Sequence, residues 1–445
     1  MNYNERFENV TIVGAAGKMG SGILLLTAME MYNISMKPEN KDKDYILYAF
    51  DISQNALSGL KTYIQDQLTK QAERKIEILK EHYKDKKDLA NDSDIISQYV
   101  KDVMAMIQPV TTIESAYESH IIFEAASENP DLKTKIFAQI NANSKCEPWF
   151  FTNTSSIPIS YLNEKANLNG RIIGVHFYNP PAVQKLVEVI KCDQTPDIMG
   201  EFVSTYIKNL RKIEVPSYDK AGFIGNGHFM RDALYGMMRM ENLRKDMSFA
   251  EAVYIVNKVT QDFLIRPMGI FQLIDYVGID VCQFIMKVMK PYVTDEDIHS
   301  PLLDTMMEIG VKGGQNHDGS QKDGFLKYEK GRIVAIWDLD KKEYVKIEDI
   351  SEKCDKLIGA LPQEHQPWKV VVRDPNKNEF LTKYFSALQK ENGMGAKLAV
   401  EYHIKSKQIG EKLVSDKVAF NADDVNTVLM TGFFHAYGPI NDFSK

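Results

Sequence analysis

The stretch that decides the fold is Val10-Thr11-Ile12-Val13-Gly14-Ala15-Ala16-Gly17-Lys18-Met19-Gly20, near the start of the chain. Its β-branched beginning favours a short strand, and helix-forming residues 21–29 follow the last glycine. A turn without side chains lets the backbone approach a pyrophosphate closely, and the N-terminus of the next helix offers N–H groups to it. The GxxGxxG spacing is one residue longer than the usual GxGxxG, so the turn alone is also compatible with a plain strand–helix connection.

A second strand, Tyr45-Ile46-Leu47-Tyr48-Ala49-Phe50, ends at Asp51. A carboxylate at this place accepts hydrogen bonds from the ribose hydroxyls of an adenosine. Its neighbours Ile52 and Ser53 include no arginine for a 2′-phosphate, which favours NAD over NADP. The alternative role of Asp51 is to cap the following helix, and both roles can hold together.

The order of further segments predicts a sheet and then helices. Strand patterns recur at 121–126, 149–152, 171–177 and 185–190, and residues 53–110 form a lysine-rich helical hairpin by their apolar spacing. We therefore expect an α/β N-terminal, Rossmann-like doubly wound sheet followed by an all-α C-terminal part. The expected domains are 1–215 for NAD with the inserted hairpin, 216–330 as a helical domain for dimerisation and substrate, and 331–445 as a β excursion and a second helical unit. Residues 421–440 loosely echo 249–271, which suggests a duplicated helical unit with different internal spacing.

Composition restricts the function classes. The chain has 445 residues, 44% apolar and 26% charged, and a net charge of −7, which is unlike a general nucleic-acid binder. No apolar run approaches the roughly 20 residues of a membrane helix, and the N-terminus shows no export signal. The four cysteines are far apart and form no CxxC pair, so we expect reduced thiols, no metal site and a cytoplasmic location.

Two polar residues stand out within buried strand patterns. His176 follows Ile172-Ile173-Gly174-Val175, and Glu188 lies inside Leu186-Val187-Glu188-Val189-Ile190. An isolated buried charge is costly, and Asn179-Pro180-Pro181 reverses the chain between the two strands, so Glu188 is expected beside His176. A histidine oriented by a carboxylate is a general base, although a purely structural pair is equally compatible with these residues.

Several motifs follow one another in a specific order. The first three are Ser127-Glu128-Asn129-Pro130-Asp131-Leu132-Lys133, Thr152-Asn153-Thr154-Ser155-Ser156 and His176-Phe177-Tyr178-Asn179-Pro180, the last running on to Lys185-Leu186-Val187-Glu188-Val189. The next are Ala221-Gly222-Phe223-Ile224-Gly225-Asn226, Arg266-Pro267-Met268-Gly269 and Asp275-Tyr276-Val277-Gly278. Over about residues 8–330 the chain resembles the L-3-hydroxyacyl-CoA dehydrogenase family, in its longer form with a second helical C-terminal unit.

This resemblance implies NAD-dependent oxidation of L-3-hydroxyacyl-CoA to 3-ketoacyl-CoA, in fatty-acid β-oxidation or a related acyl-CoA pathway. His176 would take the proton of the 3-hydroxyl with Glu188 as its partner, while Ser155 and Asn226 would hydrogen-bond the reacting oxygen or the thioester carbonyl. The implied cofactor-binding residues are Gly14, Gly17, Lys18, Met19, Gly20, Asp51, Glu128, Lys133, Asn153 and Asn179. The hairpin would lie over the coenzyme A arm, with Gln67 and Arg74 near the positions that hold it.

Without the resemblance, each assignment has a plainer alternative. Ser155 is then a turn hydroxyl, Asn226 a helix-start residue, and Lys133, Gln67 and Arg74 belong to solvated helix faces. The family's lysine before its terminal Gly-Phe-Tyr is displaced or absent in Gly319-Ser320-Gln321-Lys322-Asp323-Gly324-Phe325-Leu326, so that role is not assigned.

Two other functions use the same fold. One is an NAD-dependent dehydrogenase of a free hydroxy acid such as gulonate, and the other is a non-catalytic, crystallin-like protein. For assembly we expect a homodimer, or a monomer if the C-terminal repeat replaces the partner.

Overall fold

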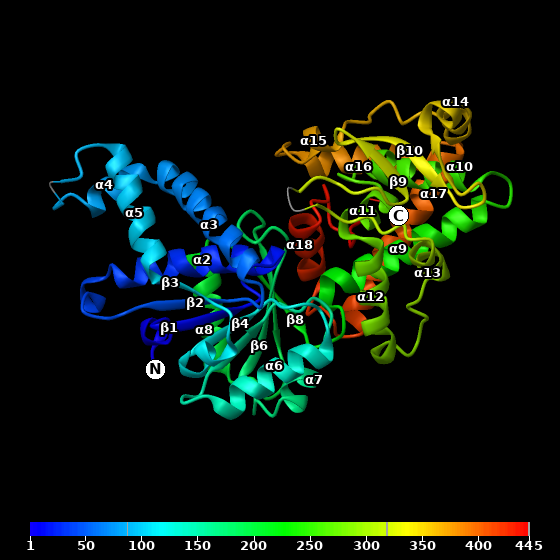
Figure 1. Ribbon diagram of the computed structural model, residues 1–445. Helices are drawn as coiled ribbons and strands as arrows, with labels where there is room; N and C mark the ends of the chain where they lie inside the picture. Colours follow the sequence, from blue (N-terminus) through cyan, green and yellow to red (C-terminus); the bar gives the residue numbers. More distant parts are fainter. Residues whose placement is uncertain (87, 317–318, 444–445) are drawn as a thin grey trace. The chain divides into compact units, whose positions relative to one another are not determined.

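The computed structural model describes residues 1–86, 88–316 and 319–443. Its contacts divide the chain into two compact units, Met1–Asp219 and Lys220–Lys445 (Figure 1). The sequence analysis placed the first boundary after residue 215, but strand β8 (Ile213–Tyr218) crosses that position and pairs with its neighbour β7. Pro216 resembles a break in the sequence, yet β8 is an edge strand, where a residue without an N–H donor is tolerated.

The first unit contains eight strands and the helices that connect them. The strands are β1 (Asn9–Val13), β2 (Ile46–Phe50), β3 (Ile107–Val110), β4 (Ile121–Glu124), β5 (Trp149–Thr152), β6 (Ile172–Phe177), β7 (Leu186–Lys191) and β8 (Ile213–Tyr218). The helices are α1 (Tyr3–Arg6), α2 (Lys18–Ser35), η1 (Pro38–Asn40), α3 (Gln54–Arg74), α4 (Ile76–His82), α5 (Asp92–Met106), η2 (Ile113–Glu118), α6 (Pro130–Asn143), α7 (Ile159–Lys165) and α8 (Asp197–Asn209).

All eight strands form one sheet in the order β3-β2-β1-β4-β5-β6-β7-β8. Strands β1 to β6 are parallel, whereas β7 is antiparallel to β6 and β8 is parallel to β7. The order changes direction between β1 and β4, because β1 pairs with β2 on one side and with β4 on the other. This switch point is where doubly wound sheets bind ligands, outside the carboxyl ends of the strands. The predicted Rossmann-like sheet is confirmed.

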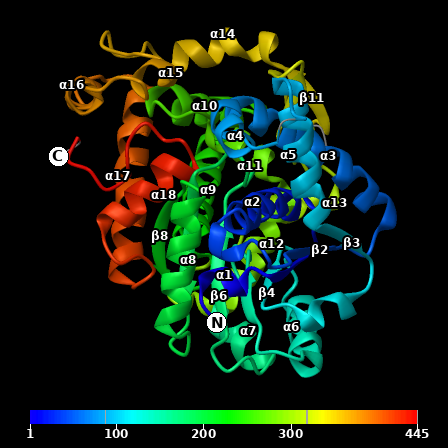
Figure 2. The same ribbon diagram turned by 90° about the vertical axis from the view of Figure 1, so that its left-hand side faces the viewer.

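The sequence pattern predicts the helical hairpin but not the short strand that follows it. The helical hairpin is present as α3, α4 and α5 (Figure 2), and the apolar residues Leu57, Leu60, Ile64 and Leu68 form the buried face of α3. Strand β3 was assigned to the helical stretch, because its four residues Ile107-Gln108-Pro109-Val110 are too few to alternate clearly.

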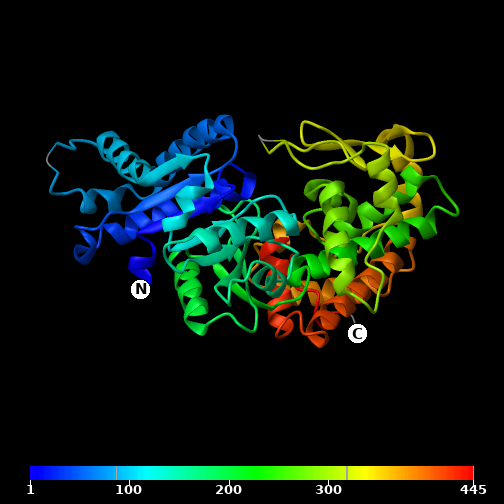
Figure 3. The ribbon, with the colours of Figure 1, turned by 60° about the horizontal axis from the view of Figure 1, so that its bottom comes forward.

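The second unit is mostly helical (Figure 3). Its helices are α9 (Phe223–Leu243), α10 (Phe249–Lys258), η3 (Val259–Phe263), α11 (Ile270–Val277), α12 (Ile279–Met289), η4 (Lys290–Tyr292), α13 (Pro301–Glu308), α14 (Ile347–Ile358), α15 (Trp368–Val371), α16 (Lys377–Leu388), α17 (Met394–Ser415) and α18 (Ala422–Gly432). An antiparallel sheet in the order β11-β10-β9 is formed by β9 (Leu326–Glu329), β10 (Arg332–Asp338) and β11 (Glu343–Lys346).

One apolar core spans the whole second unit. It contains Phe249 and Phe271 from the first half and Tyr384 and Tyr402 from the second half. Residues 331–445 therefore share a core with 220–330, whereas the sequence analysis divided them at 330. No helix among the described residues is long and apolar enough to cross a membrane.

Both copies of the suggested repeat contain the same hydrogen bond, from a backbone N–H to an asparagine side chain beside a glycine. The Asn257 side chain accepts a hydrogen bond from the Gln272 backbone at 2.9 Å, and a Cβ at Gly269 would meet that asparagine. Asn426 likewise accepts from the Ile440 backbone at 3.0 Å, beside Gly438. The separation from asparagine to glycine is the same in both copies. The two copies differ in spacing only when they are aligned at the starts of α10 and α18. Asn426 lies nearer to the start of its helix than Asn257 does.

Candidate active site

The glycine-rich turn lies at the switch point of the first unit's sheet. Gly14 directly follows β1 and has φ +77°, and a Cβ there would lie 2.7 Å from the Ala125 carbonyl oxygen, just after β4. A Cβ at Gly20 would lie 2.0 Å from the Gly14 carbonyl oxygen. Side chains therefore do not fit at these two positions. Gly17 is the N-cap of α2 and makes no side-chain cap hydrogen bond. The positive end of this helix therefore lies at the glycine turn, where it suits a phosphate group.

Asp51 connects the second strand to this turn. Its Oδ2 accepts a hydrogen bond from the Ala16 backbone at 3.1 Å, and its Oδ1 accepts from the Ser53 backbone at 3.1 Å. The N-cap of α3 is Ser53, whose hydroxyl accepts from Ala56, so the capping alternative for Asp51 is not what the structure shows. The glycine turn, the uncapped helix and this carboxylate fit an NAD dinucleotide, and Lys18 and Met19 lie in the first turn of the same helix.

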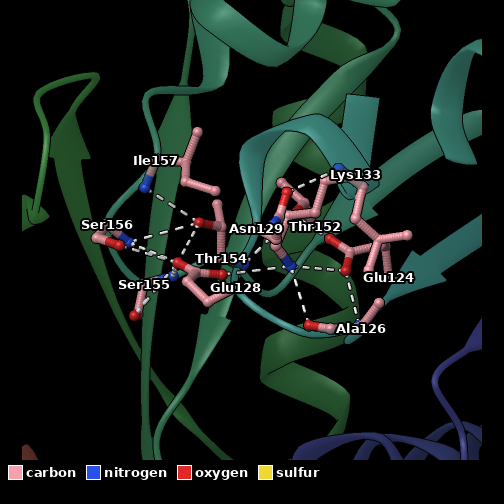
Figure 4. Close-up of polar contacts among 11 residues, drawn as sticks. Glu124, Ala126, Glu128, Asn129, Lys133, Thr152, Thr154, Ser155, Ser156 and Ile157 are labelled. Atoms are coloured by element: carbon pink, nitrogen blue, oxygen red, sulfur yellow. Dashed lines mark hydrogen bonds and ion pairs between the residues drawn. The ribbon is translucent and has the colours of Figure 1, made fainter. Parts of the chain in front are cut away.

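Behind the carboxyl end of β4 lies a buried ion cluster (Figure 4). The Lys133 ammonium on α6 lies 2.6 Å from Glu124 Oε1 and 3.3 Å from Glu128 Oε2. Lys133 is only 1% exposed and Glu124 is fully buried. Burial lowers the pKa of Lys133, but the two carboxylates outweigh it and raise the pKa above its usual value. Lys133 is therefore a buried cation in this structure, and its predicted contact with the cofactor stays a prediction.

Glu128 in turn holds the turn at 154–156. Its Oε1 accepts hydrogen bonds from the Thr154 hydroxyl at 2.6 Å, the Ser155 backbone at 2.8 Å and the Ser156 backbone at 3.1 Å. Burial raises the pKa of Glu128, but Lys133 and these donors keep it below its usual value. A charged carboxylate thus fixes the backbone that carries Ser155.

His176 and Glu188 are in direct contact. They are register partners on the antiparallel strands β6 and β7, and His176 Nδ1 lies 2.9 Å from Glu188 Oε2. The Glu188 side chain is fully buried and that of His176 is 10% exposed. The reversal at Pro180 thus brings together the two residues that the sequence analysis paired. Such a pair can orient an imidazole and stabilise its protonated form.

Two asparagines complete this end of the sheet. Asn153 Oδ1 accepts from the Phe177 backbone at 2.8 Å, which ties the 154–156 turn to the strand residue after His176. Asn179 follows on the same chain segment, and its buried Oδ1 has no hydrogen-bond partner within the described residues. A buried amide oxygen without a partner is costly, so a bound ligand that donates a hydrogen bond fits there.

The remaining predicted residues lie on helices. Gln67 and Arg74 are two turns apart on α3, so they share one face of that helix, with Arg74 in its last turn. Asn226 is in the first turn of α9, in the second compact unit. Among the described residues, no group of three or more His, Cys, Asp or Glu side chains could hold a metal ion.

Sequence reasoning missed Glu124 and Tyr178. Glu124 ends the apolar run Ile121-Ile122-Phe123, which is the same signal that identified Glu188. Tyr178 donates a hydrogen bond from its hydroxyl to Glu188 Oε2 at 2.9 Å. A tyrosine that follows a strand is common in proteins of any function, so the sequence pattern does not indicate a special role for Tyr178.

Comparisons with known proteins agree with this geometry. The 3-hydroxyacyl-CoA dehydrogenase NAD binding domain matches residues 51–220, and the C-terminal domain of the same family matches residues 249–323. A probable 3-hydroxyacyl-CoA dehydrogenase of Caenorhabditis elegans is 30% identical over 327 residues, covering 73% of this chain and 94% of that protein. The human mitochondrial hydroxyacyl-coenzyme A dehydrogenase is 27% identical over 331 residues, which cover 72% of this chain and 91% of that protein.

Solved structures extend the likeness to the whole chain. The crystal structure of 3-hydroxybutyryl-CoA dehydrogenase from Escherichia coli has a TM-score of 0.62 at 19% identity and covers 98% of this chain and 90% of that one. At this identity the likeness shows the fold alone.

Together, the Rossmann-like sheet, the glycine turn and the matched NAD-binding domain define an NAD-dependent oxidoreductase. The chain belongs to the 3-hydroxyacyl-CoA dehydrogenase family.

Proposed function

We propose that this enzyme oxidises the 3-hydroxyl group of an L-3-hydroxyacyl-CoA to the 3-ketoacyl-CoA, reversibly, with His176 as the general base. The observation that carries the proposal is the 2.9 Å contact between His176 Nδ1 and the buried Glu188 carboxylate. The family match and the relatives' names support the substrate class.

The pair suits removal of a hydroxyl proton. Because Glu188 accepts the Nδ1 hydrogen of His176, the imidazole keeps its lone pair on Nε2. That lone pair takes the proton of the substrate hydroxyl while the C3–H bond breaks and the carbonyl forms. The glycine turn and Asp51 would hold NAD, which would supply the acceptor for the hydride that leaves C3. The Glu188 carboxylate then stabilises the imidazolium.

Other residues of the proposal bind and orient. The Ser155 hydroxyl, on the turn that Glu128 fixes, donates to the reacting oxygen. The role of Asn226 toward this oxygen or the thioester carbonyl stays a prediction. Gln67 and Arg74 present one face of α3 to the nucleotide end of coenzyme A, where a guanidinium suits its 3′-phosphate. The cytoplasmic location and the homodimer stay predictions.

The test is NADH formation, at saturating NAD, from L-3-hydroxybutyryl-CoA, its D-enantiomer and gulonate. We expect turnover of the L-thioester, at least about 100-fold above both other compounds, because only this substrate offers the thioester and the nucleotide arm with the correct configuration. Faster turnover of gulonate would contradict the proposal and favour a free hydroxy acid. An absence of NADH from every substrate, with NAD still bound, would instead favour a non-catalytic protein.

A further inference from the structure

The His176–Glu188 pair has a third member that neither the motifs nor the comparisons assign. The Tyr178 hydroxyl donates to Glu188 Oε2 at 2.9 Å, and His176 Nδ1 lies 2.9 Å from the same oxygen. The rings of His176 and Tyr178 also lie against each other, with centroids 4.8 Å apart and a 40° tilt. One carboxylate oxygen is therefore shared by two side chains that lie on the same chain segment.

We propose that Tyr178 is a positioning residue for the reaction: its hydroxyl fixes the Glu188 carboxylate and lowers the pH at which His176 becomes able to accept a proton. This inference rests on the proposed role of His176 as the base. Tyr178 does not need to touch the substrate, because it acts through Glu188.

The physical reason is competition for one negative oxygen. A donor on a carboxylate stabilises the negative charge and reduces its attraction for a neighbouring cation. With Tyr178 in place, Glu188 orients the imidazole but stabilises the imidazolium less than it would alone. His176 then gives up its proton at a lower pH and is a competent base over a wider range.

Tyr178 stays a donor throughout that range. Burial and the neighbouring Glu188 charge raise the pKa of Tyr178 well above 10, so the hydroxyl keeps its hydrogen at every pH at which the enzyme is assayed. The hydrogen bond therefore does not titrate away as His176 changes its charge.

The strand register and the packing give two further neighbours of the pair. Val215 is the partner of Glu188 on β8, and Ile159 of α7 faces Gly174 of β6, two residues before His176. Neither titrates. The 154–156 turn beside β6 is held by the charged Glu128, which a Tyr178 variant leaves unchanged. His176 and Tyr178 are two titratable groups that contact the shared Glu188 oxygen.

The experiment compares wild type with Tyr178→Phe, which removes one oxygen and keeps the ring. In NADH formation from L-3-hydroxybutyryl-CoA, we expect the acid limb of the kcat/KM profile to move up by about half a pH unit, while the KM for NAD stays unchanged. Tyr254→Phe is the matched control, because the Tyr254 hydroxyl also donates to a carboxylate, Asp355 at 3.0 Å, and it should leave the profile unchanged.

A double-mutant cycle separates this role from a structural one. In a Glu188→Gln background, Tyr178→Phe should move the acid limb by less than about 0.1 unit, because the charge through which it acts is gone. An equal shift in both backgrounds, or an acid limb that Tyr178→Phe leaves in place, would overturn the proposal.

A measurement without turnover keeps the two proposals distinguishable. In the NAD-bound protein labelled with 13C-histidine, the His176 resonance, assigned with His176→Gln, should titrate at higher pH in Tyr178→Phe than in wild type. If wild type forms no NADH, the proposed reaction fails, and this titration still decides whether Tyr178 controls the imidazole. Identical titrations would reject the role of Tyr178 even if His176 is the base.

Discussion

The Lys133 ammonium lies 2.6 Å from the Glu124 carboxylate, and the two side chains are 1% and 0% exposed. This buried pair joins α6 to the carboxyl end of β4, and through Glu128 it reaches the turn that carries Ser155. A buried charge needs its partner, because an unpaired charge in the protein interior is strongly unfavourable. Removing one member of the cluster should therefore lower the free energy of unfolding.

Removing the cation of this cluster should destabilise the enzyme strongly. Lys133→Met leaves Glu124 charged and buried, so we expect the free energy of unfolding in urea to fall by about 3 kcal/mol or more. Lys135→Met is the matched control, since Lys135 is exposed on the same helix and its loss should change stability by less than about 0.5 kcal/mol. Equal effects of the two substitutions would show that the cluster has no structural role.

The glycine turn predicts a specific loss of cofactor binding. Gly14→Ala puts a Cβ 2.7 Å from the Ala125 carbonyl oxygen at a φ of +77°, so the turn proposed to bind the dinucleotide must change its conformation. We expect the Kd for NAD, measured by calorimetry, to rise by about tenfold or more. Gly59→Ala, a helix position with nothing within 4 Å, should keep NAD affinity and slightly stabilise the protein. Unchanged affinity in Gly14→Ala would place the dinucleotide elsewhere.

Arg74 should affect only substrates that carry the nucleotide of coenzyme A. Arg74→Met is expected to raise the KM for L-3-hydroxybutyryl-CoA by about fivefold, through loss of a charge-assisted contact with phosphate. The KM for the N-acetylcysteamine thioester, which lacks the nucleotide, should not change. Lys61→Met removes a cation from another face of α3 and serves as the control. A similar rise for both thioesters in Arg74→Met would argue against the proposed contact.

Two buried histidines predict acid lability. Burial lowers the pKa of both His228 and His403 to about 4, and both lie in the second unit. Between pH 6.5 and 4 the unfolded chain binds more protons than the folded one, so stability is complete above about pH 6.5 and falls as the pH falls towards 4. Each histidine can contribute up to about 3 kcal/mol to this loss. Urea unfolding at pH 7.0, 5.5 and 4.5 checks it, and His403→Gln should show a shallower decline than wild type. An equal decline in the variant would assign the acid sensitivity to other groups.

Much of the fold and part of the site could be predicted from sequence patterns, because these patterns are local. A β-branched run with glycines predicts β1 and the turn at Gly14, and an acidic residue in an apolar run predicts that Glu188 needs a partner. The order of motifs then indicates the family. The edge strands β3 and β8 were not predicted, since both contain proline and β3 has only four residues.

The remaining features depend on contacts between distant residues. Lys133 can be buried because Glu124 and Glu128 lie beside its ammonium group. The spacing of residues along α6 does not reveal these two partners. The shared oxygen of Glu188 follows from the register of β6 against β7 and from the direction of the Tyr178 side chain. The single core of the second unit likewise requires α17 to pack on α9, which a boundary read from composition does not show.

The most direct measurement is the rate of NADH formation from L-3-hydroxybutyryl-CoA by His176→Ala, together with its affinity for NAD. The account predicts a fall in kcat of about 1,000-fold, with the Kd for NAD within about twofold of wild type. His299→Ala, which removes another histidine paired with a carboxylate, Asp304 at 2.7 Å, should retain wild-type turnover. Wild-type rates in the His176 variant would contradict the claim that this imidazole is the base.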